Sequence, residues 1–384
     1  MTPMELRGRH YRTKEPIRLH MANGLISRLE PIAPEPDEAL PWIAPGIVDL
    51  QINGYGGLDF NAPPLQEEAI HRMSQALSKE GVTSYYPTII TNGSSVIEAS
   101  LKVLAKAIRS GHKASESIAG IHLEGPFISP EDGPRGAHPR EHVIAPDWDL
   151  FQRWQEAAEG HIRIITLSPE WPGSSEFIAK CAASGVIVSI GHTAAAAGQI
   201  EEAAAAGASM STHLGNGAHL TLPRHPNYIW DQLAEERLSA CFIADGFHLP
   251  DSVLKVILKV KSDRAMLVSD AVSFSGMPPG TYSHHIGGKV VLTPEGKLHM
   301  QEQPGLLAGS VKLPAYQIAY LVRRGLCTLP QAWDLASVIP SRFMGLPTQE
   351  GLRIGAQADL AVFDWDGREL QIRQSFKKGQ PAFG

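Results

Sequence analysis

Cysteine is scarce in this sequence, and the few cysteines that occur lie far apart. Three are present in 384 residues, at positions 181, 241 and 327, and no two of them form a Cys-x-x-Cys pair. This spacing argues against a disulfide framework and against a structural zinc site built from thiolates. We therefore expect isolated, apolar cysteines in a reducing compartment.

The sequence also lacks a surplus of positive charge and long hydrophobic runs. Its formal net charge is −6, which argues against a nucleic-acid partner, because such proteins usually carry a basic face. A small anionic substrate remains compatible, since a few local cations suffice to bind it. No apolar run is long enough to span a bilayer, and the start, MTPMELRGRHYRTKEP, has no apolar signal-peptide core. We expect a cytoplasmic protein with no membrane association.

Short β-rich runs alternate with longer helical stretches from Ala44 onward. Each run is almost continuously apolar, as expected of parallel strands that are covered on both faces. Eight such runs predict an α/β fold, a (β/α)₈ TIM barrel. An open doubly wound sheet is the alternative, but no Gly-x-Gly-x-x-Gly follows the first run. The runs are Gly46–Leu50, Val82–Pro87, Ile118–His122, Ile162–Leu167, Val186–Ile190, Ser209–His213, Ala240–Ala244 and Ala265–Val268.

The helical stretches carry their own start and stop signals. Residues 65–79 place apolar side chains four residues apart on one stripe, which predicts an amphipathic helix. The next helix opens with Ser95-x-x-Glu98, a capping-box pattern. Gly81, Gly185 and Gly207 each stand at or next to the start of a β-rich run, where glycine can adopt the left-handed conformation that ends a helix.

Both ends of the chain return to β character. We predict that residues 1–44 and 345–384 form one small β-sandwich domain and that residues 45–344 form the barrel. The stretch Ser273–Gln303 contains Gly287-Gly288 and Pro294-Glu295-Gly296, which predicts a hairpin insertion after the eighth strand.

Polar residues follow several of the predicted strands. Because chemistry in a barrel is located at the carboxyl ends of its strands, these residues are candidates for one site. Two imidazoles and a carboxylate with an open position for water are typical of a hydrolytic metal site, and a further carboxylate could move the water proton. The strand-end residues are Gln51, Asn53, Glu124, His192, His213, Asp245, His248 and Asp270.

Structural alternatives exist for each candidate. An isolated histidine is more often a surface or hydrogen-bonding residue than a ligand. Glu124 could be a buried salt-bridge partner, and Asp270 could cap the turn that follows it. His192 and His213 come directly after apolar strands, where an unpaired polar ring is costly, and this favours the ligand interpretation.

Several segments together resemble the N-acetylglucosamine-6-phosphate deacetylases of the amidohydrolase superfamily. They occur in the family's order and span most of the chain, and the run 355–362 is similar to amidohydrolases in general. The segments are Pro45–Gly54, His122-Leu-Glu-Gly-Pro-Phe127, Gly191-His-Thr193, Thr212-His-Leu214, Ala244-Asp-Gly-Phe-His248, Val268-Ser-Asp-Ala271 and Leu307-Ala-Gly-Ser310.

The resemblance implies a barrel with a small terminal β-sandwich, a homodimer, and a phosphorylated amino-sugar substrate. It implies one divalent ion per subunit, Zn²⁺ or Fe²⁺, held by Glu124, His192 and His213. Gln51 and Asn53 stand where many amidohydrolases carry His-x-His for a second metal, and neutral amides are poorer ligands. Asp270 is then the general base and acid. The implied substrate contacts are Ala137, His138, Asn216, Gly217, Arg224, Asp245, His248, Leu307, Ala308 and Gly309, with His138 also polarising the acetyl carbonyl.

The sequence departs from the family's usual pattern in its substrate loops. Asn216-Gly-Ala218 replaces Asn-Ala-Met, Gly191-His-Thr193 replaces Gly-His-Ser, and residues 225–230 differ from the usual glycine-rich stretch. Three alternatives therefore stay open: an N-acetylgalactosamine-6-phosphate deacetylase, an amidohydrolase for another N-acyl or cyclic amide, and a non-enzymatic scaffold.

Overall fold

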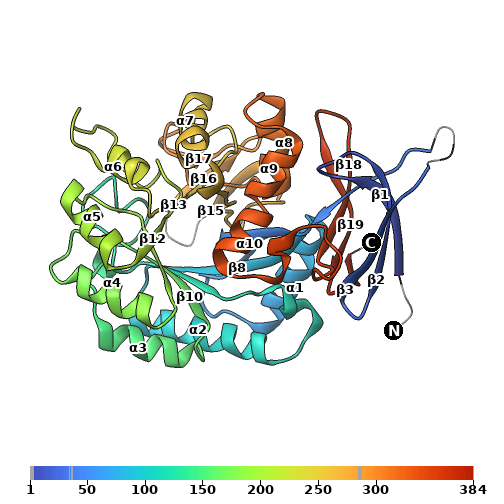
Figure 1. Cartoon of the computed structure of the whole chain (residues 1–384). Coiled ribbons are helices and arrows are strands. Elements are labelled where there is room, and N and C mark those ends of the chain that lie inside the picture. The colour runs from blue at the N-terminus through green and yellow to red at the C-terminus, as the bar shows by residue number, and fades with distance from the viewer. Residues whose placement is uncertain (1–3, 34, 36–37, 284–287, 384) are drawn as a thin grey trace.

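The computed structural model describes residues 4–33, 35, 38–283 and 288–383, which fold into a barrel and an adjoining β domain (Figure 1). Met4 and Phe383, the first and last described residues, both lie in strands of the β domain. The predicted fold class is thus confirmed. The exact division of the chain, residues 1–44 and 345–384 against 45–344, stays a proposal.

The barrel is built from eight parallel strands. They run in the order β5 (Ile47–Ile52), β8 (Val82–Ile90), β9 (Ile121–Glu124), β10 (Ile162–Leu167), β11 (Ile187–Ile190), β12 (Ala208–Ser211), β13 (Ser239–Phe242) and β14 (Ala265–Leu267). The circle closes where Ile52 forms an isolated parallel bridge with Ala271 and where the Asp270 amide donates to the Gln51 carbonyl at 2.9 Å. Each of the eight predicted runs overlaps one of these strands. The bounds differ in places: β9 begins at Ile121 rather than at Ile118, and β12 ends at Ser211, so that His213 follows it in the loop.

Helices surround the barrel strands (Figure 1). The predicted helix over residues 65–79 is α1, and Gly81, Gly185 and Gly207 have φ values of 79°, 78° and 117° as expected. The capping-box prediction was wrong: α2 begins at Ser94 with Gly93 as its N-cap and has no side-chain cap, so Ser95 already lies in the first turn. The helices are α1 Glu67–Lys79, α2 Ser94–Arg109, α3 Trp148–Ala157, α4 Ser174–Ala183, α5 Ala197–Ala206, α6 Tyr228–Ala234, α7 Asp251–Lys261, α8 Pro314–Arg323, α9 Leu329–Leu335 and α10 Val338–Met344. Among the described residues, none of these has the length and hydropathy to cross a membrane.

The β domain is one seven-stranded mixed sheet made from both ends of the chain. A bridge between Leu25 and Gln357 shows that the sheet folds back on itself. Stacked Trp333 and Phe363, with ring centroids 4.4 Å apart, join this domain to the barrel. The strand order is β20 (Gln380–Phe383), β19 (Leu370–Lys377), β18 (Leu360–Trp365), β4 (Trp42–Pro45), β1 (Met4–His10), β2 (Pro16–Ala22) and β3 (Leu25–Pro31).

Two small sheets lie near the mouth of the barrel. The predicted insertion after the eighth strand contains three antiparallel strands, β15 (Gly280–Ser283), β16 (Lys289–Leu292) and β17 (Leu298–Met300). A two-residue pair, β6 (Gly54–Tyr55) with β7 (Leu58–Asp59), follows β5. After β17, residue Ser310 forms a parallel bridge with Ala271, so the chain returns to the strand end that carries Asp270.

Candidate metal centre

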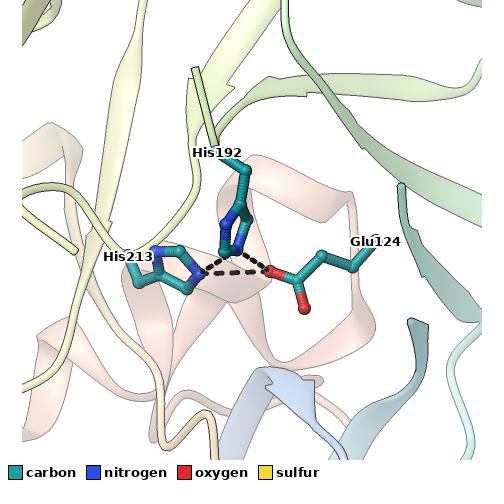
Figure 2. Close-up of side chains that lie close together, drawn as sticks. All are labelled: Glu124, His192 and His213. Carbon is teal, nitrogen blue, oxygen red and sulfur yellow. Dashed lines mark hydrogen bonds and ion pairs between the residues drawn. The ribbon is translucent and has the colours of Figure 1, made fainter. Parts of the chain in front are cut away.

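Glu124, His192 and His213 converge at the carboxyl ends of three strands, and their side chains point toward one another (Figure 2). Glu124 Oε1 lies 3.2 Å from His192 Nε2 and 3.1 Å from His213 Nε2, and the two Nε2 atoms are 3.1 Å apart. All three residues are buried. The arrangement brings together the three ligands predicted from the sequence.

The hydrogen bonds of His192 fix which of its nitrogens faces the other two side chains. His192 Nδ1 lies 2.8 Å from the Pro134 carbonyl oxygen, which can only accept, so Nδ1 carries the hydrogen. Nε2 therefore faces Glu124 Oε1, and without a second hydrogen on the ring this nitrogen is an acceptor. Two acceptors at this separation repel each other unless a proton or a cation lies between them.

The spacing of the three atoms fits a divalent cation. Ligand atoms around a tetrahedral zinc ion at its usual bond lengths are separated by about 3.3 Å, close to the observed 3.1–3.2 Å. Two imidazoles and one carboxylate leave a fourth position for water, as in catalytic sites. Within the part of the chain that the structure describes, this is the one group of His, Cys, Asp or Glu side chains close enough to hold a metal.

Charge and burial act in opposite directions on this cluster. Burial by itself raises the pKa of Glu124, but the contacts with His192 and His213 outweigh it and hold this pKa well below its usual range. Gln51 supplies a further donor, with its amide Nε2 at 2.8 Å from Glu124 Oε1. Glu124 is thus kept as a carboxylate, the form that binds metals.

Asp270 is the fourth acidic or basic group of the cluster. Burial raises the pKa of Asp270 to about 6. His213 lowers this pKa and Glu124 raises it, so Asp270 is within electrostatic reach of two of the candidate ligands. Asn53 Nδ2 donates to Asp270 Oδ1 at 2.8 Å. A carboxylate with a pKa near neutrality is suited to accept and return a proton.

The backbone at the site is strained. His192, His213 and Asp270 have φ values of 50°, 24° and 47°, a region that residues other than glycine seldom adopt. Glu170 holds the loop after β11 in place, because its carboxylate accepts from the Ala194 amide at 2.7 Å and from the Ser129 hydroxyl at 2.8 Å. Such strain is retained where the surrounding structure enforces it, and it is common at functional sites.

His138 lies against His192, one of the candidate ligands. Its ring is 4.4 Å from that of His192 in an edge-to-face arrangement, and its Nδ1 is 2.8 Å from Thr91 Oγ1. Burial, followed by the nearby His192, lowers the pKa of His138 to about 3, so the ring is neutral. His122, below Glu124 on β9, is also neutral because burial lowers its pKa to about 4.

The remaining predicted contacts are distributed around the mouth. Asp245 and His248 form an ion pair at 2.7 Å, and Gly217 lies against His192, since a Cβ added there would be 2.7 Å from His192 Nδ1. Asn216 donates to the His213 carbonyl at 3.2 Å. Residues 307–309 precede Ser310 at the Ala271 bridge. Ala137 and Arg224 are exposed, and Arg224 forms no ion pair among the described residues.

Sequence reasoning missed what Gln51 and Asn53 do. It considered them as weak ligands for a second metal, whereas the structure shows both amides donating to the two carboxylates of the site. It also missed Thr91, Glu170 and the Pro134 carbonyl. The position of Gln51 and Asn53 directly after an apolar strand was a usable signal; the other three had none.

The fold and the site together define a class of protein, the (β/α)₈-barrel hydrolases with a candidate metal centre at the mouth of the barrel. The Amidohydrolase family profile matches residues 42–383, so the chain belongs to the amidohydrolase family. It is 33% identical over 349 residues to an N-acetylglucosamine-6-phosphate deacetylase of Bos taurus, covering 88% of this chain and 82% of that protein. It is 35% identical over 331 residues to an N-acetylgalactosamine-6-phosphate deacetylase of Shewanella sp. (strain ANA-3), covering 85% and 80%.

A solved structure agrees with these relatives. The N-acetyl-D-glucosamine-6-phosphate deacetylase of Mycobacterium smegmatis, as a mutant in complex with N-acetyl-D-glucosamine-6-phosphate, superposes with a TM-score of 0.85 at 26% identity. The match covers 99% of this chain and 100% of that one. The family resemblance inferred from the sequence is thus confirmed.

Proposed function

We propose that this protein hydrolyses the acetamide of N-acetyl-D-glucosamine 6-phosphate to D-glucosamine 6-phosphate and acetate. The observation that carries the proposal is the convergence of Glu124, His192 and His213 (Figure 2). Asp270 is close enough for Glu124 and His213 to change its pKa. The relatives named above act, by their names, on acetylated amino-sugar phosphates. One divalent ion, Zn²⁺ or Fe²⁺, would be held by the three ligands.

In this mechanism Asp270 moves the protons. A divalent cation at the site supplies an acidified water and polarises a carbonyl. The Asp270 carboxylate takes a proton from the attacking water as the new C–O bond forms. It then gives that proton to the nitrogen as the C–N bond breaks, which releases the amine and acetate. The donor Asn53 keeps Asp270 oriented throughout.

His138 would stabilise the developing oxyanion. To donate from Nε2 as a neutral ring, His138 must keep its hydrogen off Nδ1, which then accepts a hydrogen bond. Among the described residues, Thr91 is the one in reach to donate it. Thr91 Oγ1 is 2.8 Å from His138 Nδ1 but 3.4 Å from the Glu124 carbonyl oxygen, so the shorter contact favours this tautomer. An aligned donor at a forming oxyanion is a large contribution to catalysis.

The sugar phosphate would bind across the mouth of the barrel. Asn216, Gly217 and Arg224 are proposed to contact the phosphate, to which arginine can bind in a bidentate manner. The other proposed contacts are Ala137, Asp245, His248 and Leu307–Gly309. Leu220 and Trp230 flank Arg224 and are 98% and 52% exposed, which supports the proposal that this segment packs against a second copy in a homodimer.

A second candidate substrate is N-acetylgalactosamine 6-phosphate. The identity of 35% to a deacetylase named for that sugar favours it. The two sugars differ at one hydroxyl group, so the same catalytic residues serve either reaction.

Acetate release separates these possibilities. The assay compares both N-acetylhexosamine 6-phosphates and their unphosphorylated forms, before and after chelation and metal return. Asp270→Asn should bind metal yet lose about 10²- to 10⁴-fold in turnover, and near-normal turnover would remove Asp270 from the mechanism. Arg224→Ala should raise the Michaelis constant for the phosphorylated sugar alone; an unchanged constant would contradict the phosphate assignment.

A further inference from the structure

A continuous chain of buried hydrogen bonds crosses the barrel directly below the three proposed ligands. His122 Nδ1 lies 3.0 Å from the Leu50 carbonyl oxygen, and His122 Nε2 lies 2.7 Å from Thr166 Oγ1. Thr166 Oγ1 is 2.7 Å from Thr212 Oγ1, which is 2.5 Å from Ser189 Oγ. These hydrogen bonds thus connect β5, β9, β10 and β11 with Thr212, the residue that follows β12.

The hydrogen atoms of this chain have one consistent arrangement. The Leu50 carbonyl can only accept, so the neutral His122 ring carries its hydrogen on Nδ1, and Nε2 must accept from Thr166. The Thr166 hydrogen is then used, so Thr212 donates to Thr166, and by the same argument Ser189 donates to Thr212. Every hydroxyl hydrogen of the chain has one acceptor, and the direction runs from Ser189 to Leu50.

Each proposed ligand lies one or two residues along the sequence from a residue that belongs to this hydrogen-bond chain or contacts it. His122 stands two residues before Glu124 on the same strand, and Thr212 directly precedes His213. The backbone before His192 rests on both threonines: a Cβ added to Gly191 would lie 2.6 Å from Thr212 Cβ and 2.9 Å from Thr166 Cγ2. Displacement of either threonine would therefore move residues on all three ligand-bearing strands.

We propose that His122, Thr166, Thr212 and Ser189 are positioning residues that set the spacing of Glu124, His192 and His213 and thereby the affinity for the metal. The inference rests on the proposed metal centre but not on the identity of the substrate. Residues beyond the direct ligands commonly change metal affinity by about 10- to 100-fold when they are replaced. The ligand triangle of Figure 2 would in this view be held from below as well as by its own loops.

The decisive variant is Thr166→Val, which keeps the shape but removes the central hydroxyl. It leaves an acceptor at His122 and a donor at Thr212 buried without partners, which is costly. Thr166→Ser keeps the hydroxyl and is the matched control. Ser211→Ala is a second control, because the buried Ser211 hydroxyl has no hydrogen-bond partner among the described residues and lies next to Thr212.

The experiment measures the dissociation constant for Zn²⁺ by competition with a chelator and the visible absorption spectrum of the Co²⁺ form. Zinc binding by the unaltered protein tests the metal centre itself. The differences between variants test the role of the hydrogen-bonded side chains below it. Thr166→Val should bind Zn²⁺ about 10- to 100-fold more weakly than Thr166→Ser, with an altered Co²⁺ spectrum. Ser189→Ala removes the first donor and leaves no buried donor without an acceptor. It should therefore weaken zinc binding by a smaller factor.

Equal Zn²⁺ affinity and identical Co²⁺ spectra for Thr166→Val and Thr166→Ser would overturn the proposal. Should Thr166→Val not fold, the comparison of Ser189→Ala with Ser211→Ala decides instead. Equal zinc affinities of these two variants would also overturn the proposal, because the hydrogen bonds would then contribute only to packing. Weaker zinc binding by Ser189→Ala would support the proposal.

Discussion

The hydrogen bond from Asn53 to Asp270 allows a quantitative prediction of how the proposed reaction depends on pH. Asn53 Nδ2 donates at 2.8 Å to Asp270 Oδ1; Asn53 is buried and Asp270 is half-buried. A hydrogen bond to a charged group contributes about 1.5–3 kcal/mol, and one pKa unit corresponds to about 1.4 kcal/mol. Its loss should therefore raise the pKa of Asp270 by about one to two units.

The variant Asn53→Leu removes the donor with little change of shape. The carboxylate of Asp270 loses stabilisation, so the proposed base stays protonated to higher pH and activity falls on the acid side. The acid limb of the profile should move up by about one to two pH units, so the rate well below the pKa should fall about 10- to 100-fold, while the rate at pH 9 stays within about twofold. The shift is the prediction, because a bound cation lowers the pKa in both proteins.

The assay is the pH profile of kcat/KM for acetate release, measured on protein of verified metal content. Asn61→Leu is the control, since the buried Asn61 side chain bonds to the Thr88 carbonyl and the Ile90 amide rather than to Asp270. It should cost stability without moving the acid limb. An unmoved acid limb in Asn53→Leu, or an equal shift in both variants, would refute the reasoning.

Three further outcomes are expected. Elemental analysis should find about one tightly bound divalent ion per chain, and two would contradict the assignment of Gln51 and Asn53 as hydrogen-bond donors. Gly217→Ala should weaken Zn²⁺ binding, because a Cβ there meets His192 Nδ1 at 2.7 Å. The control Gly111→Ala has a similar positive φ and nothing within 4 Å, so it should lower stability alone. Equal zinc affinities of the two variants would refute this. Chelation should lower the thermal midpoint and Zn²⁺ should restore it, since a ligand that binds the folded state stabilises it; an unchanged midpoint would count against a metal held by the buried cluster.

Much of the fold and the central cluster could be predicted from local patterns. Apolar runs with helices between them specify a parallel barrel. The carboxyl ends of its strands lie at one end of the barrel, independently of the conformation of the loops. For that reason Glu124, His192 and His213 could be selected as a group from the residues that follow strands, and the structure places them within 3.2 Å of one another. The roles of His138, Arg224 and His248 stay predictions.

Only the tertiary structure decided how the site is held. Gln51 and Glu124 are 73 residues apart, and Asn53 and Asp270 are 217 apart, so their hydrogen bonds depend on closure of the barrel. The left-handed backbone at His192 and the hydroxyl chain from Ser189 to His122 also arise from contacts between strands. Hydrophobic periodicity is a local property and can be read along the chain, whereas the partner of a buried polar group is chosen by packing between distant segments.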